Sequence, residues 1–376
     1  MGTIYRKRNR VSTNLQMMLR SNRYIIFIFG LMLMLSSVAG YAQKSTNCAT
    51  AIKEADEMYR EGNYDNAVLL LNSALKECKL SKREKEDAYL ILAQAYLEKE
   101  QYAEVNQLFI KLLNNDPNFK LKDILYQDDF YTYYDRIKIR PLFSAGLKLG
   151  LNFPHYAIKN LYSLNNANNY SLAYKPEVGY SYGAFAEWQF HNNISFVTDN
   201  DFSKMGYSRT INGSDVNKSI LNYSEVLKSF ETSLYVKKYF LHKQFKPFIY
   251  LGGYYTHLNN ATANVELTYK LKDNITPDVD NYYLNKSNVD MIGMRNTNRF
   301  GVISGIGVSY KTKNILLSAD VSYRVDVVRN LTNSANRYQN EDLLFTYYYI
   351  DNNVNLSRVD ITFSVAYILK YSVKSN

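Results

Sequence analysis

Eight segments in the second half of the chain alternate apolar and polar residues with a period of two. In the first, the odd positions from Phe143 to Phe153 hold Phe, Ala or Leu, and the even positions between them hold Ser, Gly, Lys or Asn. This period places successive side chains on opposite faces of a β-strand. The pattern recurs at about 178–190, 194–207, 223–240, 247–257, 299–311, 315–328 and 356–371. We therefore expect eight antiparallel strands within residues 141–376.

The connections between these segments alternate strictly in length. The short ones are His191–Asn193, Leu241–Lys246 and Thr312–Asn314. The long ones are 154–177, 208–222, 258–298 and 329–355. Barrels of the outer membrane sort their connections in this way, with short periplasmic turns and longer extracellular loops, whereas a soluble sandwich has no reason to. The sequence predicts an eight-stranded antiparallel transmembrane β-barrel, entered by the chain from its periplasmic end.

Each predicted strand has one apolar face and one polar or charged face. Eight strands enclose an interior just wide enough for side chains, and isolated charges there are costly. We therefore expect the apolar face against lipid and the charged face toward the lumen. The expected lumen charges are Lys148, Glu187, Asp199, Glu231, Lys237, Asp320, Arg324, Asp326 and Asp360. We favour a salt-bridged plug that fills the barrel, and an ion path or proton-sensitive gate stays open as the alternative.

The first 42 residues have the pattern of a secretory signal peptide. Six basic residues and no acidic ones precede or border the apolar run Tyr24–Leu35, and the small residues Gly40 and Ala42 follow it. Twelve apolar residues are too few for a comfortable membrane-spanning helix, which needs about 20. We predict a signal peptide over 1–42 with cleavage after Ala42; an uncleaved signal anchor is the alternative.

Charge and hydropathy exclude two classes of protein. The chain of 376 residues has a net charge of +10, but without the six basic residues of the N-terminus 39 Lys and Arg remain against 35 Asp and Glu. This weakens the case for a nucleic-acid-binding protein, and we expect no nucleic-acid partner. The mean hydropathy of −0.35 excludes a polytopic helical membrane protein.

Residues 43–140 have helical periodicity and contain a repeat. Gly62-Asn63-Tyr64 separates two amphipathic runs, and a second copy follows, with Ala93 lying 38 positions after Ala55. These residues resemble the tetratricopeptide repeat, although Glu100 and Val105 stand where that family prefers Gly and Ala. The resemblance implies packing positions at Ala55, Gly62, Tyr64, Ala67, Ala74, Ala93, Tyr96, Tyr102 and Pro117. We expect a further helix within 121–137.

Such helical hairpins generally form a groove that binds a peptide or protein. The resemblance therefore implies a protein partner for a periplasmic domain over 43–140. A spacer that binds nothing specific is the alternative.

The two cysteines of the chain are expected to form a disulfide. Cys48 lies at the start of the first predicted helix and Cys78 at the end of the second. In an antiparallel hairpin these two ends are neighbours, and a signal peptide sends the chain to an oxidising compartment. The sequence predicts a Cys48–Cys78 bond.

The strand half carries a second resemblance. Tyr223-Ser224-Glu225 leads into FETSLYVKKYF at 230–240, and a short turn connects this to KPFIYLGG at 246–253. These segments resemble the outer-membrane β-barrel domains of Bacteroidetes that include the PorT-like proteins, although the Pro usual in the first strand is absent. The resemblance implies the outer membrane as location, and some members of the group resemble components of secretion machinery.

No motif in the sequence indicates an enzyme or a cofactor. The four histidines, at 155, 191, 242 and 257, are expected at turns or at the rim, without a G-x-S-x-G, Walker or H-E-x-x-H motif near them. We therefore expect no catalytic, cofactor or metal site, and assign the chain to an α+β class with two domains.

Three functions stay open at this level. The favoured one is an outer-membrane anchored interaction protein, whose periplasmic helical repeats dock a partner from a secretion or envelope-assembly complex. A transport or uptake accessory, or a surface barrel that binds ligand with its long loops, is the alternative. A lipid-modifying enzyme is the third and least supported.

Overall fold

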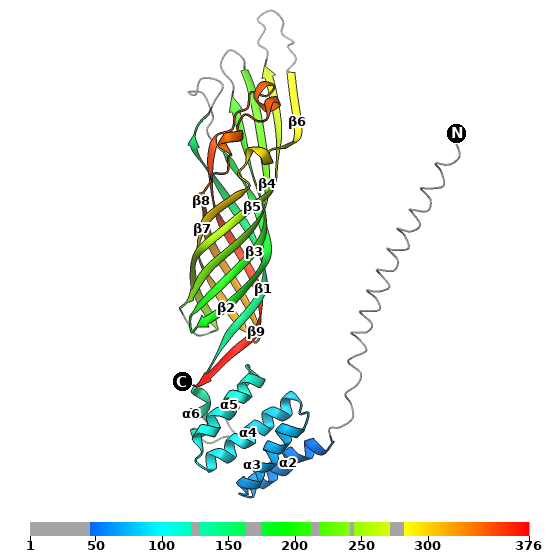
Figure 1. Ribbon diagram of the computed structural model, residues 1–376, viewed down its shortest axis with the longest axis vertical. Coiled ribbons are helices and arrows are strands. Elements are labelled where there is room, and N and C mark those ends of the chain that lie inside the picture. The colour runs from blue at the N-terminus through cyan, green and yellow to red at the C-terminus, as the bar shows by residue number, and fades with distance from the viewer. Residues whose placement is uncertain are drawn as a thin grey trace, which may run out of the picture. The chain divides into compact units, whose positions relative to one another are not determined.

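The computed structural model describes residues 46–121, 128–162, 174–212, 218–240, 244–270 and 282–375 (Figure 1). The chain divides into two compact units, one ending at Ile137 and the other spanning Lys138–Lys374. The predicted signal peptide and its cleavage site lie outside the described residues. Among the described helices, none combines the length and apolar character needed to cross a bilayer.

The first unit contains α2 (Thr46–Arg60), α3 (Tyr64–Glu77), α4 (Lys82–Glu98), α5 (Tyr102–Asn115) and α6 (Asp128–Asp135). The turns of the two hairpins α2–α3 and α4–α5 repeat in detail. Gly62 has φ +79°, and Glu100, 38 residues later, has φ +56°. In the same way, Asn63 N donates to Met58 O and Gln101 N donates to Tyr96 O, each at 2.9 Å. The two hairpins therefore share one turn geometry.

Small residues lie at the centre of the helical unit, where neighbouring helices approach closely. Ala55, Ala67, Ala74 and Ala93 are each at most 4% exposed. The aromatic positions named from the repeat are more open: Tyr64 and Tyr96 are half-buried, and Tyr102 is exposed and stacks on Tyr133 at 5.4 Å. Pro117 is half-buried beyond the end of α5.

A helix lies within 121–137, as expected. It spans Asp128–Asp135 as α6, residues 122–127 lie outside the described part, and β1 begins at Ile137. Phe130 packs edge-on against Phe109 of α5, with ring centroids 4.9 Å apart. The helix ends at Asp135, directly before the start of β1.

In the described part of the chain, eight strands close a ring. They are β1 (Ile137–Asn160), β2 (Lys175–His191), β3 (Ile194–Asn212), β4 (Lys218–Tyr239), β5 (Phe245–Lys270), β7 (Asn298–Thr312), β8 (Ile315–Val328) and β9 (Asn353–Ser375). Successive strands pair antiparallel, β9 neighbours β1, and the pairing of β4 with β5 completes the ring (Figure 1). The predicted fold of N-terminal helices followed by an eight-stranded antiparallel barrel is confirmed.

Two of the predicted long loops are largely folded. The segment 258–298 contains the upper part of β5, the additional strand β6 (Tyr282–Asp290) and the short helix η3 (Ile292–Met294). The segment 329–355 contains η4 (Ser334–Asn336) and α7 (Glu341–Phe345). β6 pairs with β5 outside the ring, with Thr262 opposite Asp290. In the described part, the strands are therefore longer than predicted, and these two segments contain regular secondary structure.

The distribution of apolar side chains reverses along the ring. Toward the short-turn end, outward side chains are large and apolar, and Leu147, Leu251 and Phe363 are between 62% and 69% exposed. Toward the long-loop end the outward positions are polar, as at Asn222 on β4, while its neighbour Tyr223 points inward and is 1% exposed.

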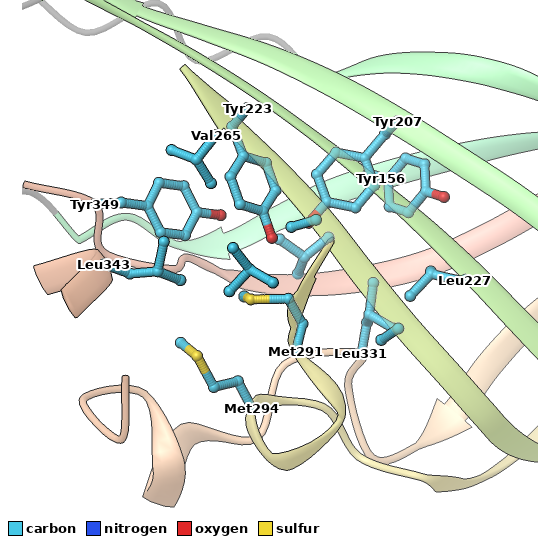
Figure 2. Close-up of a cluster of buried hydrophobic side chains, with 14 of the residues drawn as sticks. Tyr156, Tyr207, Tyr223, Leu227, Val265, Met291, Met294, Leu331, Leu343 and Tyr349 are labelled. Atoms are coloured by element: carbon cyan, nitrogen blue, oxygen red, sulfur yellow. The ribbon is translucent and has the colours of Figure 1, made fainter. Parts of the chain in front are cut away.

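The inward side chains at the long-loop end form an apolar core, which we call the cap core. Figure 2 shows the tyrosines Tyr207, Tyr223 and Tyr349 with Met291, Met294, Leu331 and Leu343. These residues come from β3, β4, the segment from Met291 through η3, and the segment between β8 and β9. The same strands therefore have a lipid-type exterior at one end and the interior of a water-soluble protein at the other.

Candidate functional site

Among the described residues of the second unit, most buried charged side chains lie in the interior of the ring. We call its cations Lys148, Lys237, Arg299, Arg324 and Arg358, with the carboxylates Glu187, Asp199, Asp201, Glu231, Asp320, Asp326 and Asp360, the lumen network. All nine charges predicted for the lumen point inward, and the structure connects each of them to a partner. They form successive layers from the short-turn end upward.

The first layer contains Glu187 and Lys237. Lys237 Nζ lies 3.2 Å from Glu187 Oε2, and Tyr239 Oη donates to Glu187 Oε1 at 2.8 Å. The Lys237 ammonium also lies over the ring of Phe248, 4.6 Å from its centroid. The pair is thus enclosed by aromatic side chains near the short-turn end.

Lys148 connects two carboxylates in the second layer. Its Nζ lies 2.5 Å from Asp199 and 2.7 Å from Asp201. Tyr235 Oη donates to Asp199 at 3.2 Å. Asp320 accepts from Tyr250 Oη at 2.7 Å, without a Lys or Arg ion pair among the described residues.

Two arginines and two carboxylates form the centre of the network. Arg324 lies 3.1 Å from Glu231 and 2.9 Å from Asp360. Arg358 contacts the same two carboxylates, with Nε 3.1 Å from Asp360 Oδ1 and both Nη atoms bonded to Glu231. Each of the two carboxylates contacts both arginines. Removal of one arginine therefore leaves the other as the partner of both carboxylates.

Arg299 and Asp326 form the uppermost layer of the lumen network. Arg299 Nε donates to Asp326 at 2.8 Å, and Tyr254 Oη donates to the other carboxylate oxygen at 2.7 Å. Tyr254 reaches this position because β7 has glycine opposite it: a Cβ on Gly301 would lie 2.4 Å from the Tyr254 ring.

A separate charged cluster lies inside the cap core. Arg295 Nε donates to Glu225 Oε1 at 2.7 Å, and its Nη1 contacts Asp351. Glu225 also accepts from Tyr207 at 2.7 Å and from Tyr223 at 2.6 Å. The rings of Tyr223 and Tyr349 stack 4.3 Å apart, and Figure 2 shows the two rings next to each other. Arg295 thereby joins the segment after β6 to β4 and to the segment before β9.

These arrangements leave little open space in the lumen. The gap bordered by Lys148, Asp199, Asp320 and Arg324 has a volume of about 20 Å³, which is enough for one or two water molecules. The described lumen network contains five cations and seven carboxylates. Tyrosine hydroxyls donate hydrogen bonds to carboxylates that have one cation partner or none. The chemistry of the site is that of a hydrogen-bonded plug, above which the cap core lies.

Sequence reasoning missed several charges of this interior. Asp201 and Arg358 lie two residues from the predicted Asp199 and Asp360 on the same strand faces, so the period of two could have found them. Arg299 is the first residue of its predicted strand, so the alternating pattern did not indicate on which face of the strand it lies. Arg295 and Asp351 lie in segments predicted as loops, and no spacing rule connects them to Glu225.

Histidine and metal chemistry have no centre among the described residues. His155, His191 and His257 are exposed, and His257 Nδ1 lies 2.8 Å from Asn298 Oδ1. His242 lies outside the described residues. No group of three or more His, Cys, Asp or Glu in the described ranges is arranged to hold a metal ion. Cys78 follows α3, and the side chain of Cys48 lies outside the described part, so their bond stays a prediction.

Comparisons with known proteins give a family and a set of barrels. Residues 134–336 match the family model described as "Outer membrane protein beta-barrel domain". Similar solved structures include Neisserial surface protein A, at 14% identity over 62% of this chain and 99% of that chain with a TM-score of 0.29. They also include OprG from Pseudomonas aeruginosa, at 10% identity over 60% and 94% with a TM-score of 0.32. The comparison with curated proteins found no match.

The family match runs from α6 through η4 and thus covers most of the ring. It agrees with the closed eight-stranded sheet, the exposed apolar side chains at the short-turn end and the charged interior. Since it spans more than half of the chain, the protein belongs to the outer membrane protein β-barrel domain family and is located in the cell outer membrane.

Proposed function

We propose that the protein is a platform in the outer membrane, with a closed barrel as anchor and a periplasmic helical unit that docks a protein partner. The observation that carries this proposal is the filled lumen. Between the layers of ion pairs the gap lined by Lys148 and Arg324 has only about 20 Å³, and the cap core lies above it. A barrel whose lumen is filled binds its partners or ligands with surfaces outside the ring.

Strand order supports the proposed periplasmic position of the helical unit. The connections β2–β3, β4–β5 and β7–β8 are short, and β1 begins at the same end of the ring as these turns. Short turns of outer-membrane barrels are periplasmic. We therefore infer that the chain before Ile137 enters the barrel from the periplasm.

The hairpin repeat supports a docking role for this unit. The two turns share left-handed residues at Gly62 and Glu100, as expected for tetratricopeptide-like hairpins. Leu69 on α3 is 66% exposed and is a large apolar side chain at which a partner could be contacted. The resemblance to PorT-like barrels of Bacteroidetes directs the proposal to a secretion or envelope-assembly complex.

Affinity purification from detergent extracts tests the proposal. The full chain is compared with a variant lacking residues 46–121, with Leu69→Asp, and with Gln107→Asp as a matched control at an exposed position of α5. We expect one periplasmic or membrane protein to copurify in fixed ratio with the full chain and the control, and to be lost from the deletion and reduced for Leu69→Asp. An identical set of copurified proteins for all four would refute docking by the helices.

A specific observation favours a second candidate, ligand binding at the cell surface. The outward faces of β3 to β6 at the long-loop end border a hollow of about 380 Å³, lined by hydroxyl and amide side chains such as Ser208, Asn222 and Asn264. If this hollow is the working surface, Asn222→Ala should abolish binding of the ligand to whole cells while the helix deletion leaves it unchanged.

A further inference from the structure

A polar pair interrupts the apolar exterior of the barrel. On β3, Asn200 is exposed on the outward face, because its neighbours Asp199 and Asp201 point into the lumen. Thr232 of β4 lies opposite Asn200 in the sheet register, and its Oγ1 donates to Asn200 Oδ1 at 2.9 Å. The Thr232 bond uses one lone pair of the amide oxygen and neither of the two amide hydrogens.

The depth of this pair follows from the lysines on the same face of β4. Outward Lys228 and Lys238 are exposed and stand ten residues apart, with Leu234, Val236 and Phe230 between them. Thr232 is four residues from Lys228. With a rise of ~3.3 Å per residue and a strand tilt of ~40°, this places the pair about 10 Å below the lysine level, in the hydrocarbon region.

An amide at this depth has an unfavourable environment in a single barrel. The hydrocarbon region contains no water, so polar groups there require protein partners. Lipid acyl chains have neither donors nor acceptors for the remaining hydrogens of Asn200. Polar residues in such positions are rare, and they commonly mark contacts within the membrane.

The surroundings of Asn200 allow another barrel to approach. Ala184 of β2 lies directly opposite Asn200, and the neighbouring outward position is Ala186. The larger side chains Tyr182, Phe202 and Phe230 border one part of a hollow of about 810 Å³ that includes Ala184 and Asn200 and extends over β1 and β9 to β8. Small side chains at the floor of such a hollow permit close contact between backbones.

We propose that this face is the interface of a two-fold symmetric homodimer in the outer membrane. A side-chain amide has two donors and one acceptor oxygen, so it is complementary to a second copy of itself. Across a two-fold axis each Asn200 donates to the Asn200 or Thr232 oxygen of the other copy, and the contact is the same in both directions. A barrel with other residues would need its own amide or hydroxyl at this depth, whereas a second copy always supplies one.

The dimer is measured with the full-length protein in lipid bilayers, by energy transfer between labelled copies over a series of protein-to-lipid ratios. We expect wild type to dimerise, and Asn200→Leu to weaken the dimer roughly ten-fold, since two reciprocal bonds in a membrane together contribute that much. Val321→Leu is the matched control. It lies outward on β8 and is not among the residues that border this hollow, and β8 is separated from β3 by three strands in either direction around the ring.

Retained resistance to SDS before boiling shows that each variant is a folded barrel. A second measurement places the interface: oxidation of Asn200→Cys in native membranes should give a crosslinked dimer, and Val321→Cys should not. A wild-type monomer at all ratios, equal affinity for wild type and Asn200→Leu, or equal crosslinking at both positions would overturn the proposal.

Discussion

At the scale of single residues, Arg324 is the most connected cation of the lumen network. It contacts Glu231 at 3.1 Å and Asp360 at 2.9 Å, and Ser233 accepts from its Nη1 at 3.1 Å. We predict that Arg324→Ala lowers the free energy of unfolding by about 3–5 kcal/mol, because it leaves buried carboxylates with fewer partners. The measurement is urea unfolding in lipid or detergent, followed by the loss of SDS-resistant migration.

A double variant separates this electrostatic effect from lost packing. Asp360→Asn added to Arg324→Ala should recover part of the stability, because it removes the excess buried negative charge and leaves Arg358 paired with Glu231. Lys228→Ala, at an exposed outward position, serves as control and should change little. Equal stability of Arg324→Ala and wild type would show that water fills the lumen and screens these charges.

Tyr134 of α6 gives a prediction for the dependence of stability on pH. Burial, with smaller contributions from Asp135 and Asp116, raises the pKa of Tyr134 from 10.0 to about 12. Its hydroxyl donates to Phe119 O at 2.6 Å. Because the folded state holds the proton more tightly than the unfolded chain, this contribution is complete below pH 10 and is lost as pH rises toward about 12.

We therefore expect wild type to lose stability relative to Tyr134→Phe as pH rises from 10 to about 12, so that the difference between their free energies of unfolding becomes smaller. Urea unfolding monitored by helical circular dichroism at several pH values measures it. A difference that stays constant over this range would mean that the hydroxyl titrates as it does in the unfolded chain.

At the scale of the element, the α4–α5 turn contains an unfavourable residue. Glu100 adopts φ +56°, a left-handed conformation in which a side chain is strained and glycine is not. We predict that Glu100→Gly stabilises the helical unit by about 1 kcal/mol. Lys99→Gly is the control: Lys99 has φ −89°, so glycine there should give no gain. Thermal unfolding of the helices compares the two, and equal effects would exclude conformational strain as the cause.

The α2–α3 hairpin carries the predicted disulfide. Cys48 lies in the first turn of α2 and Cys78 directly follows α3. A bond between them closes a loop of about 30 residues and should contribute about 3–4 kcal/mol in the chain-entropy model. Mass spectrometry of a digest made without reductant should show the linked peptides. Free alkylation of both thiols in native protein would show that the bond does not form.

The ring strands could be predicted because each has a long run with period two and one strongly apolar face, as in Phe143–Phe153. The upper part of the strands could not, because Asn and Ser occupy the outward positions there and the pattern resembles a loop. The sequence pattern of β6 is weaker still, because Val289 is its only buried residue in the described part. The contact of Arg295 with Glu225 joins positions 70 residues apart, so only the fold brings them together.

At the scale of the whole molecule, the lumen network and the cap core predict a barrel that does not conduct. Purified full-length protein in planar bilayers should show small and rare conductance steps at most, because ion passage requires the layers around Arg324 and Arg295 to separate. Large, steady currents from protein that also migrates as a folded barrel would mean that the interior is hydrated and open.

The reversal of apolar side chains along the strands has a consequence for biogenesis. The upper segments of β3, β4 and β5 must cross the bilayer before Tyr207, Tyr223 and their neighbours can collapse into a core on the far side. Once this core has formed, movement of the barrel back toward the periplasm would bring the polar exterior around the core into hydrocarbon. The barrel therefore cannot move back unless the core unfolds. Folding outside the cell thus makes insertion a one-way step.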